Sequence, residues 1–186
     1  IGIIGAGNYS RTVILPLLHR QEEYNIVALA DNKGSMAKQL GEKYNVNFIS
    51  TDYNKLLDNK NIDTVYIATR HDTHQSIACE SLKANKNVIC EKPAAMNIEE
   101  LDELMRCIHE SRKIFHVGYN RRFSDFAKKA KSLISGKALI SIVVNNKKMN
   151  SNAWQLDPNL GGGRIIGESC HFFDLINYLI NEKPLS

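Results

Sequence analysis

The first ten residues restrict the fold of this chain more than any other stretch. Residues 1–4, Ile-Gly-Ile-Ile, are typical of a buried strand, and Gly5-Ala6-Gly7-Asn8-Tyr9-Ser10 follows directly. Gly-x-Gly-x-x-Ser between a strand and a helix is typical of a dinucleotide-binding loop whose third glycine is replaced by a small residue. Gly5 would permit the tight turn, and Gly7 would let the backbone approach a pyrophosphate at the helix N-terminus. The alternative is a structural turn without a ligand.

A second apolar run, residues 26–30, ends in Asp31. An acidic residue at this distance from the glycines typically bonds the adenosine ribose and disfavours a 2′-phosphate. Asp31 therefore favours NAD, while Lys33 keeps NADP open as the second candidate.

Strand-like and helix-like patterns alternate as far as residue 117, which predicts βαβ units and a parallel sheet. We expect an α/β fold of the doubly wound Rossmann type over residues 1–119, followed by a second domain over 120–186. Asp72 with Gln75, and Asn97 with Glu100, are predicted capping pairs of two helices. The second of these helices should face the core with Ile98, Leu101, Leu104, Met105 and Ile108.

Lys92 follows the apolar run 87–90 and stands between Glu91 and Pro93. Proline favours extended geometry in the preceding residue, and ligands of open α/β sheets bind beyond the carboxyl ends of strands. Lys92 is therefore a candidate for chemistry, the alternative being a surface lysine beside a helix start. Four residues that follow the preceding strand should border the cofactor cleft: Thr69, Arg70, His71 and His74. A packed or solvated role for His74 is the alternative.

The second domain should contain a strand over 139–144 and a polar, glycine-rich loop over 145–163 with Trp154. Glu168, His171 and Asp174 are spaced by three, so they should share one face of a helix that begins near Glu168. A neighbouring carboxylate would orient the histidine as a proton carrier. The alternatives are solvated polar residues at a helix end and half of a di-iron site. The chain has no second Glu-x-x-His, so no metal is expected.

Composition excludes several classes of protein. The chain has 186 residues, 43% of them hydrophobic, and a net charge of +4. It is neither disordered nor fibrous, nothing indicates a nucleic-acid partner, and no apolar run reaches the ~18 residues of a membrane span. Its cysteines, which form no Cys-x-x-Cys pair, are expected to be reduced thiols of a cytoplasmic protein: Cys79, Cys90, Cys107 and Cys170. Because the chain starts inside a strand, we expect a fragment.

Four motifs together resemble the glucose-fructose oxidoreductase and inositol dehydrogenase (Gfo/Idh/MocA) family. They are Gly5-Ala6-Gly7, Glu91-Lys92-Pro93, residues 118–123 (Gly-Tyr-Asn-Arg-Arg-Phe), and the run from Gly161 through His171 to Asp174. The resemblance covers essentially the whole chain. It implies a Rossmann domain followed by the beginning of an α/β domain with a large open mixed sheet, which holds substrate and often the homo-oligomer contact.

The resemblance also implies residue roles. Lys92 resembles the active-site lysine beside the nicotinamide, and His171 the histidine that exchanges the substrate hydroxyl proton. The family commonly has an aspartate four residues before that histidine, where this chain has Gly167, and its carboxylate comes one place later at Glu168. Residues 163–168 are similar to a subgroup fused behind a zinc-alcohol-dehydrogenase-like domain.

We therefore expect hydride transfer between a nicotinamide and a hydroxyl-bearing carbon of a sugar, nucleotide sugar or cyclitol. His171 would be the acid/base, with Glu168 beside it, and Lys92 would donate to the substrate oxygen. Candidate substrate contacts are Asn120, Arg122, Trp154 and Asp174. The alternative function is a dinucleotide-binding sensor or scaffold without turnover.

Overall fold

The computed structural model describes residues 1–181. They form two compact units that meet in sequence between Val117 and Gly118. None of the helices in the described part of the chain combines the length and the apolarity that a membrane crossing requires.

The first unit is built on one six-stranded parallel sheet with the strand order β3-β2-β1-β4-β5-β6. Its strands are β1 (Gly2–Ile4), β2 (Ala28–Ala30), β3 (Phe48–Ser50), β4 (Thr64–Ile67), β5 (Asn87–Cys90) and β6 (Phe115–Val117). Its helices are α1 (Leu15–His19), α2 (Gly34–Tyr44), α3 (Asn54–Leu57), α4 (His74–Lys83) and α5 (Ile98–Ser111). The predicted Rossmann-type, doubly wound sheet is confirmed.

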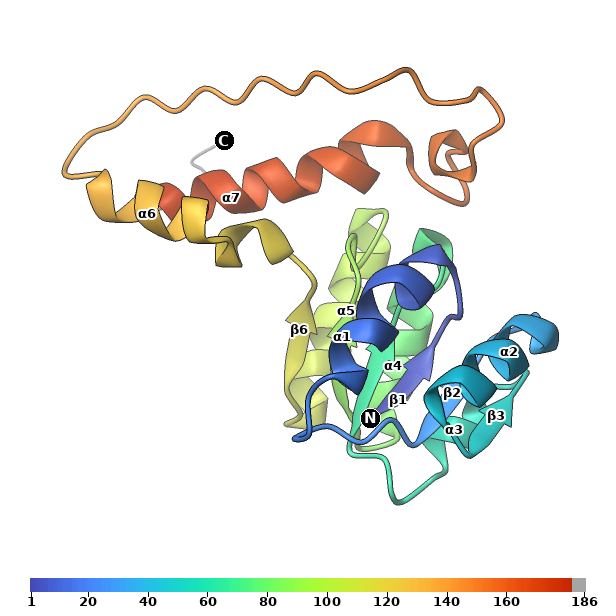
Figure 1. The fold of residues 1–186 in the computed structure, drawn as a ribbon. Helices are drawn as coiled ribbons and strands as arrows, with labels where there is room; N and C mark the ends of the chain where they lie inside the picture. The colour runs from blue at the N-terminus through green and yellow to red at the C-terminus, as the bar shows by residue number, and fades with distance from the viewer. Residues whose placement is uncertain (182–186) are drawn as a thin grey trace. The chain divides into compact units, whose positions relative to one another are not determined.

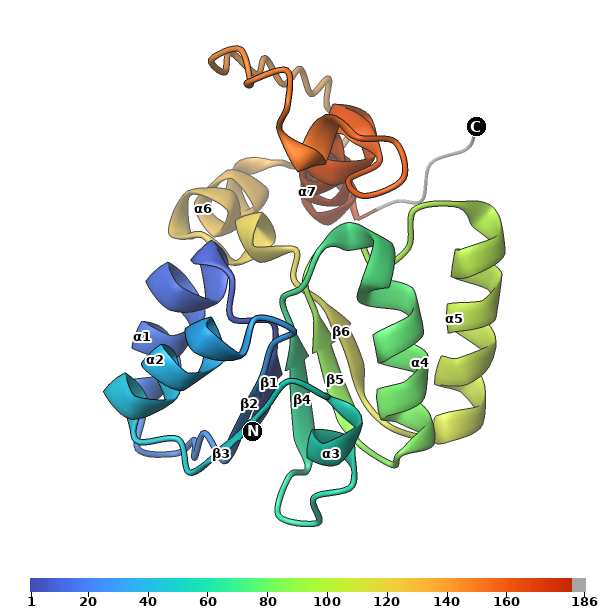
Figure 2. The same ribbon diagram turned by 90° about the vertical axis from the view of Figure 1, so that its right-hand side faces the viewer.

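Helices cover both faces of this sheet, as Figure 2 shows with α1 and α2 on one side and α3, α4 and α5 on the other. Successive strand residues point to opposite faces, so neighbours such as Ile3 and Ile4 belong to different core clusters. Both are almost completely buried, and burying a side chain of this size contributes about 1.5–3 kcal/mol. The two faces fix the register of β1 and therefore the place where the glycine loop begins.

The predicted cap of α5 is confirmed. Asn97 Oδ1 accepts a hydrogen bond of 2.8 Å from the Glu100 amide, and Glu100 Oε2 accepts one of 2.8 Å from the Met96 amide. The predicted apolar stripe of this helix is only partly correct. Leu104 is buried, but Ile98, Leu101 and Met105 are exposed, because Cys107 takes the core-facing position one turn after Leu104.

The predicted cap of α4 is wrong. No side chain caps this helix, and a 3₁₀ turn over His71–Thr73 leads into it instead. The Gln75 amide donates to Cys79 Sγ at 3.4 Å. The tight turn already uses backbone groups at the helix start, since the Thr73 amide donates to the Arg70 carbonyl at 3.2 Å.

The expectation of reduced thiols is wrong for two of the cysteines. Cys79 on α4 and Cys107 on α5 form a disulfide. The two helices pack side by side on the same face of the sheet (Figure 1), which brings together cysteines 28 residues apart in sequence.

The regular elements in the described part of the second unit are helices and helical turns, with α6 (Asp125–Leu133) and α7 (Cys170–Ile180) packed against each other. The expected strand over 139–144 is not formed. A strand requires hydrogen bonds to a neighbouring strand, and no described residue pairs with this segment, in which Leu139 and Val143 are exposed. The start of the last helix also differs from expectation, because Glu168 lies in a π-helical turn over Ile165–Ser169 that precedes α7.

Candidate functional site

The glycine loop turns sharply at the carboxyl end of β1. Gly5 has a φ of +104°, and a Cβ atom there would lie 2.5 Å from the Ala68 carbonyl oxygen. Only glycine fits this position without strain. Gly7 is different, because a Cβ atom there would meet no heavy atom within 4 Å. The fold does not require glycine at position 7, whereas a ligand that approaches the backbone would.

Asp31 ties the glycine loop to the end of β2. Its Oδ2 atom accepts a hydrogen bond of 2.6 Å from the Ala6 amide, and its Oδ1 atom accepts one of 2.7 Å from the Lys33 amide. Each carboxylate oxygen has two acceptor sites, so one on each remains for a hydroxyl group. The carboxylate is thus fixed beside the loop with acceptor capacity to spare, which fits the ribose of a dinucleotide.

The polar residues of the loop bond mainly within it. The buried Ser10 hydroxyl donates to the Gly5 carbonyl at 2.5 Å, and Asn8 Oδ1 accepts from Arg11 at 2.9 Å. Tyr9 is half-buried and packs against the core cluster under α1 and α2. Ser10 therefore closes the loop from inside, while the exposed Gly7 and Asn8 form its outer surface.

The carboxyl end of β5 carries Glu91 and Lys92, and the Lys92–Pro93 peptide bond is cis. The Tyr66 hydroxyl of β4 donates to Glu91 Oε1 at 2.5 Å. Burial raises the pKa of Glu91, whereas the Tyr66 bond and the Lys92 charge act in the opposite direction. Tyr66 thus fixes the residue that precedes Lys92.

His74, the first residue of α4, connects the ends of two strands. Its Nδ1 atom lies 2.7 Å from the Pro93 carbonyl oxygen, and its Nε2 atom lies 3.2 Å from the Thr69 carbonyl oxygen. Burial lowers its pKa, although both carbonyls act in the opposite direction. His74 is 1% exposed, so in this structure it positions backbone beside Lys92. Thr69 is half-buried in the turn that follows β4, and Arg70 is exposed there.

The second unit holds the remaining candidates. His171 lies on the first turn of α7, and its ring packs edge-on against Tyr119 at 6.2 Å between centroids. Glu168 Oε2 accepts bonds of 2.8 and 3.2 Å from Arg164. Glu168 is thus bonded to an arginine four residues earlier, a helical spacing visible in the sequence.

Arg122 and Asp174 bond to each other. Arg122 Nε donates to Asp174 Oδ2 at 2.8 Å, and a second guanidinium nitrogen bonds Oδ1. The Asp174 carboxylate raises the pKa of Arg122, mainly through this bond. Asn120 is exposed in a 3₁₀ turn over Asn120–Phe123, and Trp154 is half-buried in another over Trp154–Leu156.

Within the first unit, a hollow of about 490 Å³ lies at the amino ends of β4, β5 and β6, whereas the glycine loop and Lys92 follow the carboxyl ends of their strands. The buried Lys86 lines it, and its Nζ donates to the Asn59 and Ile62 carbonyls at 2.8 Å each. The Lys86 ammonium is therefore held by backbone carbonyls, at the end of the sheet opposite the glycine loop.

Sequence reasoning missed three residues around these candidates. Tyr66, Arg164 and Tyr119 contact Glu91, Glu168 and His171 respectively. Of these contacts, only the one between Arg164 and Glu168 could have been predicted from the sequence, because the two residues are four positions apart, the spacing of neighbours on a helix. The other two contacts depend on the packing of separate elements.

Comparison with known proteins identifies relatives. Residues 1–119 match a family model described as an oxidoreductase family with an NAD-binding Rossmann fold. The chain is 26% identical over 185 residues to a myo-inositol 2-dehydrogenase of Thermotoga maritima, covering 98% of this chain and 55% of that protein. It is 24% identical over 191 residues to a trans-1,2-dihydrobenzene-1,2-diol dehydrogenase of Xenopus tropicalis, covering 100% and 58%.

Among solved structures, a probable dehydrogenase from Thermotoga maritima superimposes with a TM-score of 0.85 at 24% identity. This match covers 98% of the present chain and 55% of the other, and it supports the fold alone. The chain spans about half the length of the curated relatives it matches.

Proposed function

Since the chain belongs to the Gfo/Idh/MocA family of oxidoreductases, whose NAD-binding Rossmann domain it matches over residues 1–119, we propose that it is part of an NAD(P)-dependent dehydrogenase. The reaction is hydride transfer between a nicotinamide and a hydroxyl-bearing carbon of a sugar, nucleotide sugar or cyclitol. The relatives named above, a myo-inositol and a dihydrodiol dehydrogenase, support a substrate with neighbouring ring hydroxyls.

One observation carries the cofactor proposal. The Asp31 carboxylate is bonded to the glycine loop at 2.6 Å, beside a Gly7 whose side-chain position is open. Asp31 would accept the ribose hydroxyls, and the amides of the exposed residues Gly7 and Asn8 would face the pyrophosphate. The fixed negative charge favours NAD, with NADP as the second candidate. The bound nicotinamide supplies the hydride acceptor or donor.

The chain's own residues would handle the proton and the oxygen. Oxidation of a hydroxyl group requires a base for its proton and a cation beside the developing alkoxide. We assign the base to His171 and the cation to Lys92. Glu91, held by Tyr66, and Pro93, contacted by His74, would position Lys92 from both sides.

The second unit would supply the substrate contacts. Glu168, paired with Arg164, would stand beside His171 as a positioning carboxylate. Asn120 and Trp154 are proposed to contact the substrate, and Arg122 and Asp174 enter the proposal as one ion pair. Phe126 and Phe173 are exposed, which supports further coverage by the rest of the second domain or by another copy in a homo-oligomer. We place the enzyme in the cytoplasm, where nicotinamide cofactors are available.

The test is a titration of the full-length protein with NADH and NADPH, followed by nicotinamide fluorescence. A panel of inositols, free sugars and nucleotide sugars is then added to the complex. We expect tight NADH binding and turnover of one class in the panel. Binding without turnover of any member would favour the sensor alternative, and failure to bind either cofactor would reject both functions.

A further inference from the structure

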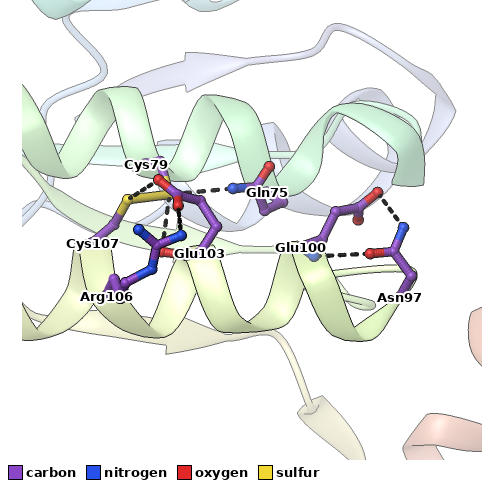
Figure 3. A network of polar contacts seen from close by, with 7 residues as sticks. All are labelled: Gln75, Cys79, Asn97, Glu100, Glu103, Arg106 and Cys107. Carbon is purple, nitrogen blue, oxygen red and sulfur yellow. Dashed lines mark hydrogen bonds and ion pairs between the residues drawn. A yellow bond between two sulfur atoms is a disulfide. The ribbon is translucent and has the colours of Figure 1, made fainter.

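The cysteine pair of α4 and α5 belongs to a buried core cluster but has polar side chains beside it, and the proposed reaction does not use it. Figure 3 shows Cys79 and Cys107 joined between the helices, with Gln75, Glu103 and Arg106 around them. Both cysteines are 3% exposed. The Glu103 and Arg106 side chains form an ion pair beside them and are 37% and 70% exposed, so solvent lies one layer away.

The surrounding groups suit thiol chemistry. Glu103 Oε1 lies 3.7 Å from Cys107 Sγ, within reach of a thiol proton. The Gln75 amide donates to Cys79 Sγ at 3.4 Å, which stabilises a thiolate there. Cys90 differs in that it is a free cysteine without a disulfide partner, and burial raises the pKa of its thiol.

A permanent disulfide does not fit the proposed location of the enzyme. In the cytosol of most organisms, disulfides are rare, and those that occur are usually transient and catalytic or redox-sensing. A cytoplasmic dehydrogenase with a disulfide between two surface-layer helices therefore points to a pair that forms and breaks. This step of the argument rests on the proposed function, whereas the geometry above does not.

We propose that Cys79 and Cys107 are a reversible oxidation site that reacts with low-molecular-weight disulfides such as glutathione disulfide. Glu103 takes the Cys107 proton, and the Cys107 thiolate attacks one sulfur of the small disulfide and releases one thiol. The Cys79 thiolate then attacks the Cys107 sulfur of the mixed disulfide and releases the second thiol. The protein loses two electrons and two protons, and the small disulfide gains both.

The bridge encloses the part of the chain that carries Lys92. The closed loop runs from Cys79 through β5, Glu91 and Lys92 to Cys107, with a sequence separation of 28. His74, which contacts the Pro93 carbonyl, begins the same helix that carries Cys79. Oxidation therefore restrains the two helices that flank the lysine motif, and it removes conformational freedom from the unfolded chain.

The test uses the whole chain in glutathione buffers of graded ratio, with thiol alkylation, peptide mass mapping and thermal unfolding. We expect a Cys79–Cys107 linked peptide at oxidising ratios that disappears at reducing ratios while the fold is kept. Cys90 should remain a thiol throughout. The oxidised form should unfold about 10 °C higher.

Variants test the role of Glu103. Glu103→Gln should slow bridge formation at least about tenfold, whereas Glu99→Gln, on the first turn of the same helix, should not change the rate. These readouts require no cofactor or substrate, so they are independent of the proposed dehydrogenase. The peptide mapping uses the wild-type chain, so it does not depend on whether a variant folds.

Three results would overturn the proposal. The first is no linked peptide at any ratio, and the second is a bridge that can be reduced only by unfolding the protein. The third concerns metal, because ligand atoms of Cys79, Glu103 and Cys107 lie within 4.8 Å of one another. One equivalent of Zn²⁺ retained by the reduced protein through both thiols would assign a metal site instead.

Discussion

The Asp31 carboxylate accepts a hydrogen bond of 2.6 Å from the Ala6 amide, 25 residues earlier in the chain. This bond joins the ends of β1 and β2. The residue proposed to bond the ribose therefore also fixes the loop proposed to bind the pyrophosphate. A change at Asp31 therefore acts on cofactor choice and on loop geometry, and the two effects require different substitutions to separate them.

Asp31→Asn should change cofactor preference while keeping the bond to the Ala6 amide. The asparagine oxygen can accept from the Ala6 amide, its NH2 group then replaces the oxygen that accepts from the Lys33 amide, and the negative charge that repels a 2′-phosphate is lost. We expect the ratio of NADPH to NADH affinity to rise at least about tenfold, equivalent to ~1.4 kcal/mol. Fluorescence titrations with both cofactors measure it. An unchanged ratio would mean that Asp31 serves the loop alone.

Gly5→Ala and Gly7→Ala form a matched pair. Alanine at position 5 meets the Ala68 carbonyl at a φ of +104°, so the free energy of unfolding should fall by about 1–3 kcal/mol. Alanine at position 7 meets nothing, so stability should change by less than about 0.5 kcal/mol while NADH affinity falls at least about tenfold. Denaturant unfolding and cofactor titration provide the two measurements. Full NADH affinity in Gly7→Ala would contradict the proposed pyrophosphate position.

Lys92→Met and His171→Asn should each reduce turnover by about 10²–10⁴-fold with NADH binding retained. The substitutions remove the proposed cation and the proposed base. Steady-state rates of the full-length protein on its best substrate measure the loss. The controls are Lys113→Met, in the hollow at the amino ends of β4, β5 and β6, and His109→Asn, on the exposed side of α5. Wild-type rates in Lys92→Met would remove this lysine from the mechanism.

His74 should make stability depend on pH. Burial lowers its pKa, so below about pH 6.5 the unfolded state binds a proton that the folded state resists. The free energy of unfolding should therefore fall as pH decreases from about 6.5 toward the lowered value. Denaturant unfolding between pH 5 and 8, compared with His74→Gln, measures the effect. An equal slope in both proteins would assign the pH dependence to other groups.

Asp174→Asn should destabilise the second unit. The Asp174 side chain is 7% exposed and the Arg122 side chain is 34% exposed. The substitution leaves the Arg122 guanidinium without its charge partner. Because the arginine is partly solvated, the cost should be about 1–3 kcal/mol, below that of a fully buried pair. Asp125→Asn, at a completely exposed carboxylate, is the control and should cost less than Asp174→Asn. Equal unfolding midpoints for the two variants would contradict a stabilising role of the pair.

Local signals in the sequence predicted most of the first unit. The alternating pattern identified the sheet, and Asn97 with Glu100 marked the start of α5 correctly, because these features depend on neighbours in sequence. The capping prediction failed at Asp72 and Gln75, where a 3₁₀ turn over His71–Thr73 leads into the helix in place of a side-chain cap.

Contacts between segments that are distant in sequence could not be predicted from the sequence pattern. Cys79 meets Cys107, and Tyr66 meets Glu91, only because the sheet places their elements side by side. The apolar run 139–144 has strand-forming residues, but no described residue pairs with it. A strand-like sequence pattern is necessary for pairing in a sheet, but it does not provide the neighbouring strand to which the hydrogen bonds are made.

The strand order has a consequence for protein synthesis. β1 lies between β2 and β4, and Gly2 pairs with Val65 as well as with Ala28. During synthesis β1 therefore waits for β4 until the chain has been made as far as residue 67 and this segment has left the exit tunnel. Pairings between segments so far apart in sequence form slowly. Until β4 has emerged, the edge of β1 that pairs with β4 in the folded sheet has no strand to pair with.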